Sequence, residues 1–176
     1  MKVAERTFAP TDIAPIARTT EEWRQALVEK AKVKTPTFFH MRAQLPAEGR
    51  TNQVLGASSQ MNVVLKTYAS GGENELHAHT NEDHLFVILQ GGAVFHGPRG
   101  EERKVVKNDC VMVPCGALYS FTATEGEPLV LLRVGAIVDQ DKDVMDRIDR
   151  EGVPIDGFSE RNKEVPVVLQ ENRWFE

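Results

Sequence analysis

The sequence has few cysteines and no long apolar run, and both shortages exclude classes of protein. Only Cys110 and Cys115 are cysteines among 176 residues, so a secreted disulfide framework is not expected. No stretch approaches the roughly 20 apolar residues of a membrane span, and residues 1–6 lead into no signal-peptide core. We expect a cytoplasmic protein that neither crosses nor binds a membrane.

Positive charge is also in short supply. Lys and Arg number 21 against 26 Asp and Glu, and aromatic residues make up only 7%. Without a basic stripe and interleaved aromatics, nucleic acid is not an expected partner. The 41% of hydrophobic residues is ordinary for a globular domain, and a chain of this length can bury a core without a metal. A bound metal would therefore serve function.

The chain divides into three parts: an extension over 1–35, a β-rich core over 36–136 and a polar arm over 137–176. The extension predicts an amphipathic helix over about 20–33, with Thr19 as its N-cap. In the core, short runs are broken by Gly, Pro or Asn with no helix between them, which predicts an all-β sandwich or barrel. The runs are 36–45, 52–57, 60–69, 84–90, 92–97, 101–106, 110–114, 117–124 and 128–136.

The arm has one helical candidate, over 142–150, with Val144, Met145 and Ile148 on one face. Its last residues, 173–176, contain two aromatics, which we expect to pack on a neighbour.

Three of the five histidines, His77, His79 and His84, fall within eight residues. Side chains on a strand alternate between faces, so His77 and His79 point the same way and can reach one metal ion. A turn over 80–83 would let His84 supply a third ligand. The spacing predicts a three-histidine metal site.

These residues resemble the cupin family, whose first motif reads G-x5-H-x-H-x(3,4)-E-x6-G. Gly71, His77, His79 and Gly91 match it. A second motif, G-x5-P-x-G-x2-H-x3-N, is similar to residues 108–123, and the matching residues there are Pro114 and Gly116. The resemblance covers about residues 60–135 and implies a double-stranded β-helix, the jelly-roll barrel of cupins.

The departures from the motifs fall on the metal positions of the family. His84 stands in place of the glutamate and Tyr119 in place of the second-motif histidine. Asn108 replaces a glycine and Ala123 an asparagine. Asp83 could serve as the carboxylate, but its strand parity is opposite to that of His84, so we favour His84 as the ligand.

The resemblance implies a divalent metal, with Fe(II) preferred and Zn, Mn or Ni as alternatives, and a dioxygenase whose small substrate binds the metal through oxygen. Tyr119 would ligate as a phenolate, act on the substrate as a phenol, or simply line the barrel. Phe86, Ile88 and Phe121 are expected to wall the substrate pocket. Two other functions stay open, a cupin isomerase or lyase and a non-catalytic ligand-binding module.

For the remaining candidate residues we do not expect a role as metal ligand or catalytic group. His40 and His96 lie outside the motifs, and Cys115 is expected to be a small filler. The acids near the histidines either orient imidazole rings or are solvated. These acids are Glu73, Glu75, Glu82 and Asp83.

The run 84–90 is apolar on both faces, because Phe86 and Ile88 share the face of His84 while Leu85, Val87 and Leu89 lie opposite. The second face needs a cover from the helix, the arm or another subunit. We expect a homodimer.

Overall fold

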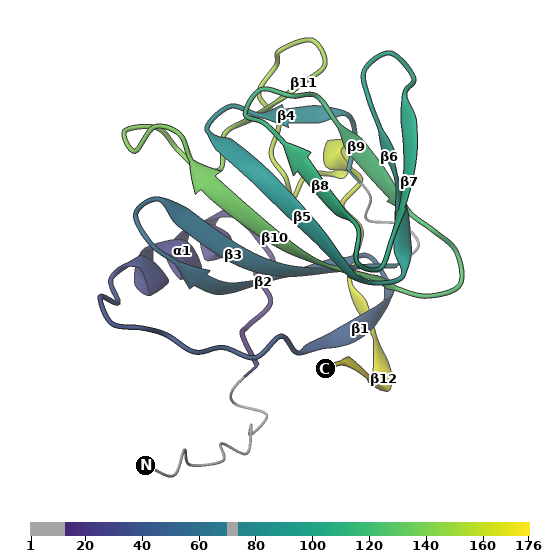
Figure 1. Cartoon of the computed structure of the whole chain (residues 1–176), viewed down its shortest axis with the longest axis horizontal. Helices are drawn as coiled ribbons and strands as arrows, with labels where there is room; N and C mark the ends of the chain where they lie inside the picture. The colour runs from purple at the N-terminus through teal and green to yellow at the C-terminus, as the bar shows by residue number, and fades with distance from the viewer. Residues whose placement is uncertain (1–12, 70–73) are drawn as a thin grey trace.

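The computed structural model describes residues 13–69 and 74–176, and in that part it contains one α-helix and twelve strands (Figure 1). Gly71 and Glu73 lie outside the described residues. The elements are α1 Thr20–Ala31, β1 Ala43–Glu48, β2 Arg50–Ala57, β3 Met61–Tyr68, β4 His77–His79, β5 Glu82–Gln90, β6 Gly92–His96, β7 Glu102–Val106, β8 Cys110–Val113, β9 Ser120–Ala123, β10 Leu129–Ile137, β11 Arg147–Asp149, the 3-10 helix Glu160–Asn162 and β12 Val168–Phe175.

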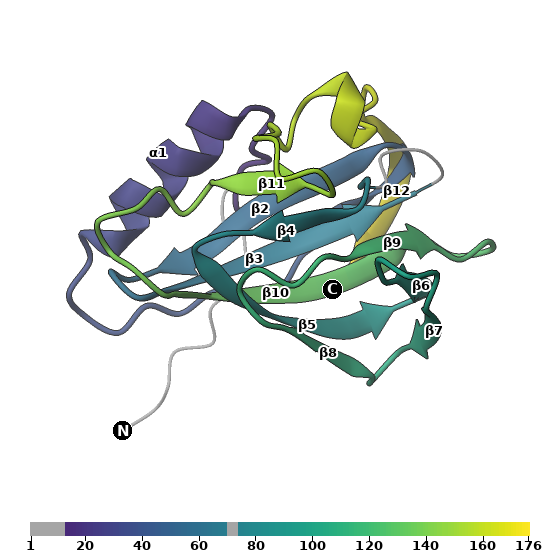
Figure 2. The same cartoon turned by 90° about the horizontal axis from the view of Figure 1, so that it is seen from above.

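The strands form a barrel of antiparallel sheets. The largest sheet has five strands in the order β2-β3-β10-β5-β8, and a three-stranded sheet, β7-β6-β9, lies across from its β5 and β8 end (Figures 1 and 2). The pair β11-β4 lies beside β9, because His77 and Tyr119 form a β-bridge. The predicted all-β double-stranded β-helix with an N-terminal helix is confirmed.

Strand alternation fills the barrel. Successive side chains point to opposite faces, so every second residue of β5 and β10 enters the interior, where eleven buried residues form one apolar cluster. Aromatic rings make up much of this cluster, and Tyr68 packs edge-on against Phe121 with ring centroids 4.9 Å apart. The cluster fixes the strands on which the functional side chains lie.

Helix α1 covers the wide end of the sheet at β2 and β3 (Figure 2). It begins as predicted, with the Thr19 hydroxyl accepting a hydrogen bond from the Glu22 amide at 3.1 Å. Its buried face, Trp23 and Leu27, packs with Val54 and Val64 of the sheet. The helix therefore closes one side of the barrel interior.

The arm differs from its prediction over 142–150, where no helix forms. Aspartates stabilise turns there, for example through the Asp143 carboxylate, which accepts from the Met145 amide at 2.9 Å. The chain then forms β11, which pairs with the histidine strand β4. Val144 and Met145 still pack against the α1 cluster, although they do so from turns and not from one face of a helix.

The ends of the β-rich core also differ from the prediction. The run 36–45 becomes a strand only from Ala43, and residues 36–42 form no strand. The C-terminal β12 pairs with β1 of the same chain, where Trp174 lies against Arg42 and Phe175 joins the cluster on the outer face of the large sheet. The aromatic tail thus packs on its own domain.

Two findings bear on the environment of the protein. Cys110 and Cys115 are both free. Within 13–69 and 74–176, no helix has the length and apolar character required to cross a bilayer.

Candidate metal and ligand site

The three motif histidines meet inside the barrel, as their spacing predicts. His77 and His79 lie on β4 and His84 on β5, and all three side chains are buried. The ring centroids of His77 and His79 are 5.1 Å apart, and those of His79 and His84 are 4.2 Å apart. The turn between the two strands therefore folds His84 back beside His79.

A carboxylate completes the closest group of potential metal ligands. One ligand atom each from His79, Glu82 and His84 lies within 4.8 Å of the others, and all three residues are buried. Glu82 and His84 are two positions apart on β5, so both point inward. His77 lies outside this group, and its role as a ligand stays a prediction.

Asp83, between them, points away from the histidines. Its carboxylate accepts a hydrogen bond from the Cys115 amide at 2.7 Å. Asp83 and His84 thus point to opposite faces of β5, as predicted. Cys115 lies in a turn that this hydrogen bond from its amide to Asp83 holds in place.

Arg133 holds Glu82 and His84 together. It comes from β10, where its guanidinium ion-pairs with the Glu82 carboxylate and donates to His84 Nε2 from Nε at 3.1 Å. Asn62 donates to the other Glu82 oxygen at 2.5 Å. Gly135 leaves room for this group, because a Cβ there would meet the Glu82 carboxylate and the Asn62 amide. Together these contacts fix the carboxylate in a space without solvent.

The protonation states of these groups suit metal ligands. Burial lowers the pKa of His77 and of His84 to about 3, and it also lowers the pKa of His79 well below its ordinary value. Burial would raise the pKa of Glu82, but the Arg133 charge, the contact with His84 and the hydrogen bond from Asn62 outweigh it, so that pKa is lowered. At neutral pH the site holds neutral imidazoles and an ionised carboxylate.

The site fits a divalent ion, and Arg133 is its internal competitor. Because a guanidinium only donates, His84 Nε2 must be an acceptor. The Arg133 guanidinium therefore occupies the His84 lone pair and the Glu82 carboxylate that a metal ion would use. Buried ring nitrogens without a partner among the described residues add further donors to the set. They are His77 Nε2 and His79 Nδ1, while His84 Nδ1, which also has no partner, carries the proton of the neutral ring.

His77 and Tyr119 form a second part of the site. His77 Nδ1 donates to the Glu75 carbonyl at 2.6 Å, which leaves Nε2 with a free lone pair. The Tyr119 ring lies 4.7 Å from the His77 ring, and burial raises the pKa of its hydroxyl well above 10. Tyr119 is therefore a phenol at neutral pH in the metal-free protein.

A cavity of about 10 Å³, enough for one water molecule, adjoins these groups. Of the predicted pocket walls, Phe86 and Phe121 line it, while Ile88 is buried in the apolar cluster beyond. The full lining is Trp23, Lys66, Asn74, His79, Phe86, Tyr119, Phe121, Arg133 and Arg147. We call this space the histidine cavity.

The cations of the histidine cavity were missed by sequence reasoning. Arg133 interrupts the apolar strand β10 on the same face as Leu129 and Leu131. Strand alternation could therefore have predicted from the sequence that Arg133 points into the barrel. Lys66 lies on β3 in the same way. Arg147 carried no such signal, because its stretch was expected to be helical.

The remaining candidates lie away from the cavity. His96 is on β6, where its Nε2 lies 3.1 Å from the Thr122 hydroxyl, and His40 is exposed in the segment before β1. Neither belongs to the histidine group.

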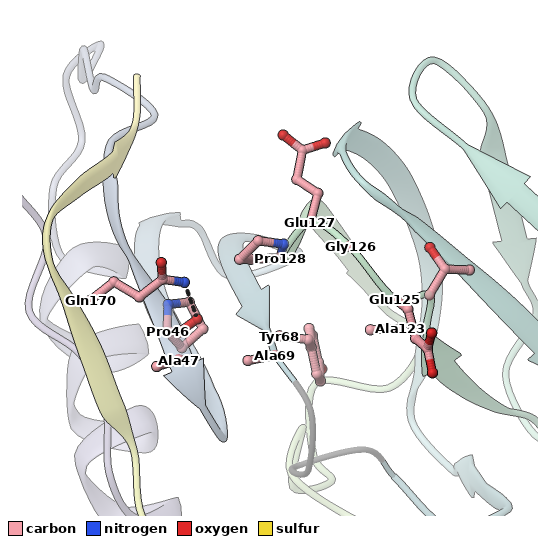
Figure 3. Close-up of a pocket in the computed structure, with 11 residues that line it drawn as sticks. Pro46, Ala47, Tyr68, Ala69, Ala123, Glu125, Gly126, Glu127, Pro128 and Gln170 are labelled. Carbon is pink, nitrogen blue, oxygen red and sulfur yellow. Dashed lines mark hydrogen bonds between the residues drawn. The ribbon is translucent and has the colours of Figure 1, made fainter.

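A larger hollow, of about 280 Å³, lies at the other end of the barrel between β12 and the loop before β10 (Figure 3). Glu125 and Glu127 are at its rim, Tyr68 lies on its floor, and Gln170 donates to the Pro46 carbonyl across one side (Figure 3). It contains no histidine, and its ionisable groups are Tyr68 and the two acids. We therefore place the functional site at the histidine cavity.

Comparison with known proteins agrees with this architecture. The family model of the cupin domain matches residues 64–135. An uncharacterised conserved protein with a double-stranded β-helix domain from Klebsiella pneumoniae is 17% identical over 61% of this chain and 93% of its own, with a TM-score of 0.53. The polyketide cyclase RemF from Streptomyces resistomycificus is also 17% identical, over 60% of this chain and 81% of its own, with a TM-score of 0.50.

These structural likenesses concern the fold alone, and no curated protein matches the chain. The matched region runs from within β3 to within β10, and so includes both histidine strands and Tyr119. Residues 64–135 of the chain are therefore a cupin domain.

Proposed function

We propose that the protein is a metal-dependent cupin enzyme acting on a small organic substrate that binds through oxygen. The observation that carries this proposal is the buried group of His79, Glu82 and His84 beside the histidine cavity. Buried, convergent ionisable groups with perturbed pKa values are typical of functional sites.

The ligand set favours iron. Two histidines and one carboxylate are the arrangement used by non-haem Fe(II) oxygenases, and this supports a dioxygenase. Zn, Mn and Ni remain alternatives, with isomerase or lyase chemistry, since ligand type selects the metal only loosely. When bound, the metal would polarise the substrate oxygen and, if it is iron, activate dioxygen.

The protein residues would position the substrate and move a proton. The Tyr119 phenol can donate to a substrate oxygen, and the free Nε2 of His77, which its low pKa keeps unprotonated, can accept a hydrogen bond beside it. Phe86 and Phe121 exclude water from the inner wall of the cavity. The raised pKa of Tyr119 favours the proton-donor role over a phenolate ligand.

Metal content per subunit tests this proposal directly. Plasma mass spectrometry of untagged protein should find near-stoichiometric metal in the wild type and a loss of at least tenfold in His79→Ala and Glu82→Gln. His96→Ala, whose ring lies outside the group, is the matched control. Equal metal in all four proteins, or none after reconstitution, would overturn the proposal. Oxygen uptake with candidate substrates then separates an oxygenase from an isomerase or lyase.

A metal-free binding module is the second candidate, and one observation favours it. Arg133 already satisfies the Glu82 carboxylate and the His84 Nε2 lone pair, so these two groups do not need a metal. Ligand affinity that is unchanged by a chelator would support this alternative.

We further propose a homodimer through the outer face of β5 and β8. Leu85 and Val87 are only half-buried there, and Met112, opposite Leu85, is 64% exposed. Apolar rows of this kind are typical of subunit interfaces. Solution scattering should give twice the chain mass of 19.6 kDa, and Met112→Glu should give the single mass. A wild-type protein of single mass removes the dimer.

A further inference from the structure

The histidine cavity has an excess of positive charge. Lys66, Arg133 and Arg147 line it, and no acidic residue does. Arg133 is ion-paired with Glu82, while the neighbouring Arg50 and Glu164 pair with each other at 2.5 Å. Because the histidines are neutral, the positive charges of Lys66 and Arg147 are left unbalanced.

Neither of these two cations has an ion-pair or hydrogen-bond partner in the described part of the chain. No ion pair or side-chain hydrogen bond joins Lys66 or Arg147 to another described residue, and Arg147 Nε is buried without a partner. The Lys66 ammonium lies over the rings of Trp23 and Tyr68, 5.1 and 5.6 Å from their centroids. Burial lowers the pKa of Lys66 well below its usual range and that of Arg147 to about 10. Both cations are therefore held at a cost in free energy.

The backbone provides a specific place for Arg147. A Cβ on Gly157 would lie 2.6 Å from the Arg147 guanidinium carbon, so this glycine makes the room in which the guanidinium packs. Arg147 pairs directly across from His79 in the β11-β4 ladder. The unpaired guanidinium is thus placed beside the proposed metal site by two independent elements.

We propose that Lys66 and Arg147 form an anion subsite that binds a carboxylate group of the substrate. The anion is a substrate only if the proposed enzymatic function holds, but anion binding at this subsite needs no metal. A planar guanidinium matches a carboxylate in two parallel hydrogen bonds, and Lys66 adds a point charge. The cavity holds only one water-sized group, so a ligand enters as the long side chains of Lys66 and Arg147 change rotamer. This small space favours a flat carboxylate over a tetrahedral phosphate.

The test measures binding of malonate, with neutral malonamide as its uncharged analogue, to the full chain in the presence of a chelator. We expect malonate to bind the wild type and malonamide not to bind. In Lys66→Met and in Arg147→Met the Kd for malonate should rise at least tenfold. Lys104→Met, which removes an exposed lysine of β7, should leave the Kd unchanged. Gly157→Ala should weaken binding while Lys66 and Arg147 are both still present.

The same variants carry a second readout that a merely structural role would not produce. Removing an unbalanced, half-buried cation should raise the melting temperature of the ligand-free protein while abolishing its response to malonate. Equal malonate binding in wild type and variants overturns the subsite, as does a wild type that binds inorganic phosphate but not malonate, or neither. Loss of metal in the metal assay with malonate binding intact would instead remove the enzyme proposal alone.

Discussion

The two ends of the barrel interior are built on the same strands and differ in almost every other respect. Along the inner face of β5, Glu82 and His84 are followed by Phe86 and Ile88, and β10 passes from Arg133 to the leucines of the core. One end, which we call the charged end, holds buried ions and the histidine cavity. The other, the apolar end, holds Tyr68, Ile88, Leu129 and Leu131, and Phe121 lies where the two ends meet, because it also lines the histidine cavity.

The comparison separates what stabilises the fold from what serves function. Apolar burial at one end is favourable by itself, with each large side chain contributing about 1.5–3 kcal/mol. Buried ions at the other end contribute only through their partners, since removing one partner leaves an uncompensated charge. The apolar end should therefore be insensitive to metal, pH and anions, and the charged end should respond to all three.

The largest effect is expected from Phe121→Ala, where the apolar end meets the histidine cavity. The side chain is 1% exposed and packs against Tyr68, Phe86 and Phe95, so the substitution leaves a cavity and should cost about 4 kcal/mol of unfolding free energy. Urea denaturation measures it. Phe38→Ala, at a side chain 88% exposed, should change nothing. A loss that added metal restores would contradict the separation of the two ends.

Arg133→Met tests the charged end with a nearly equal cost. The variant leaves the Glu82 carboxylate buried without its ion pair, and such a loss costs about 3 kcal/mol. Unlike the loss in Phe121→Ala, this loss of stability should be reversed by Zn²⁺ or Fe²⁺, because Arg133 no longer competes with the metal for Glu82 and His84. Arg99→Met, which breaks an exposed pair with Glu101, is the control and should leave the unfolding free energy almost unchanged. Urea titrations with metal and with chelator decide the matter.

The sequence predicted the apolar end better than the charged end, for a physical reason. Strand alternation and turn residues are local signals, and they gave the barrel, the helix cap at Thr19 and the inward direction of His77, His79 and His84. Register is not local. Which ion meets Glu82 depends on how β10 pairs with β5, and nothing near Glu82 in the chain specifies Arg133.

The segment containing Arg147 marks the limit of local reasoning. Val144, Met145 and Ile148 recur at helical spacing, yet aspartate turns and the open edge of β4 outweigh that pattern. Arg147 reaches the cavity only because β11 pairs with the histidine strand. The spacing of these three apolar residues could not distinguish a helix from turns followed by a strand.

Mild acid should weaken the charged end. The pKa of His77 and of His84 is about 3 when folded against about 6.5 unfolded, so between these values the unfolded chain binds more protons. Stability is therefore complete above about pH 6.5 and falls as the pH is lowered toward 3, by on the order of 1 kcal/mol per pH unit for each histidine. Denaturation of chelated protein at pH 7.5 and 5.5 measures the loss. The same loss in a His77→Asn, His84→Asn double variant would refute this origin.

The smallest expected effect comes from Thr19→Ala. This variant tests whether the two ends of the barrel unfold locally and independently of each other. The variant removes the cap of α1 and should cost about 1 kcal/mol. Helix α1 carries Trp23, whose ring lies near the cations Lys66 and Arg133, while β6 and β9 lie at the apolar end. Hydrogen exchange should therefore accelerate in α1 and β11 more than in β6 and β9. Thr122→Ala, an exposed position on β9, should leave α1 exchange unchanged. Equal acceleration at both ends in Thr19→Ala would mean that the barrel opens as one unit, and that the charged end has no separate freedom to admit a ligand.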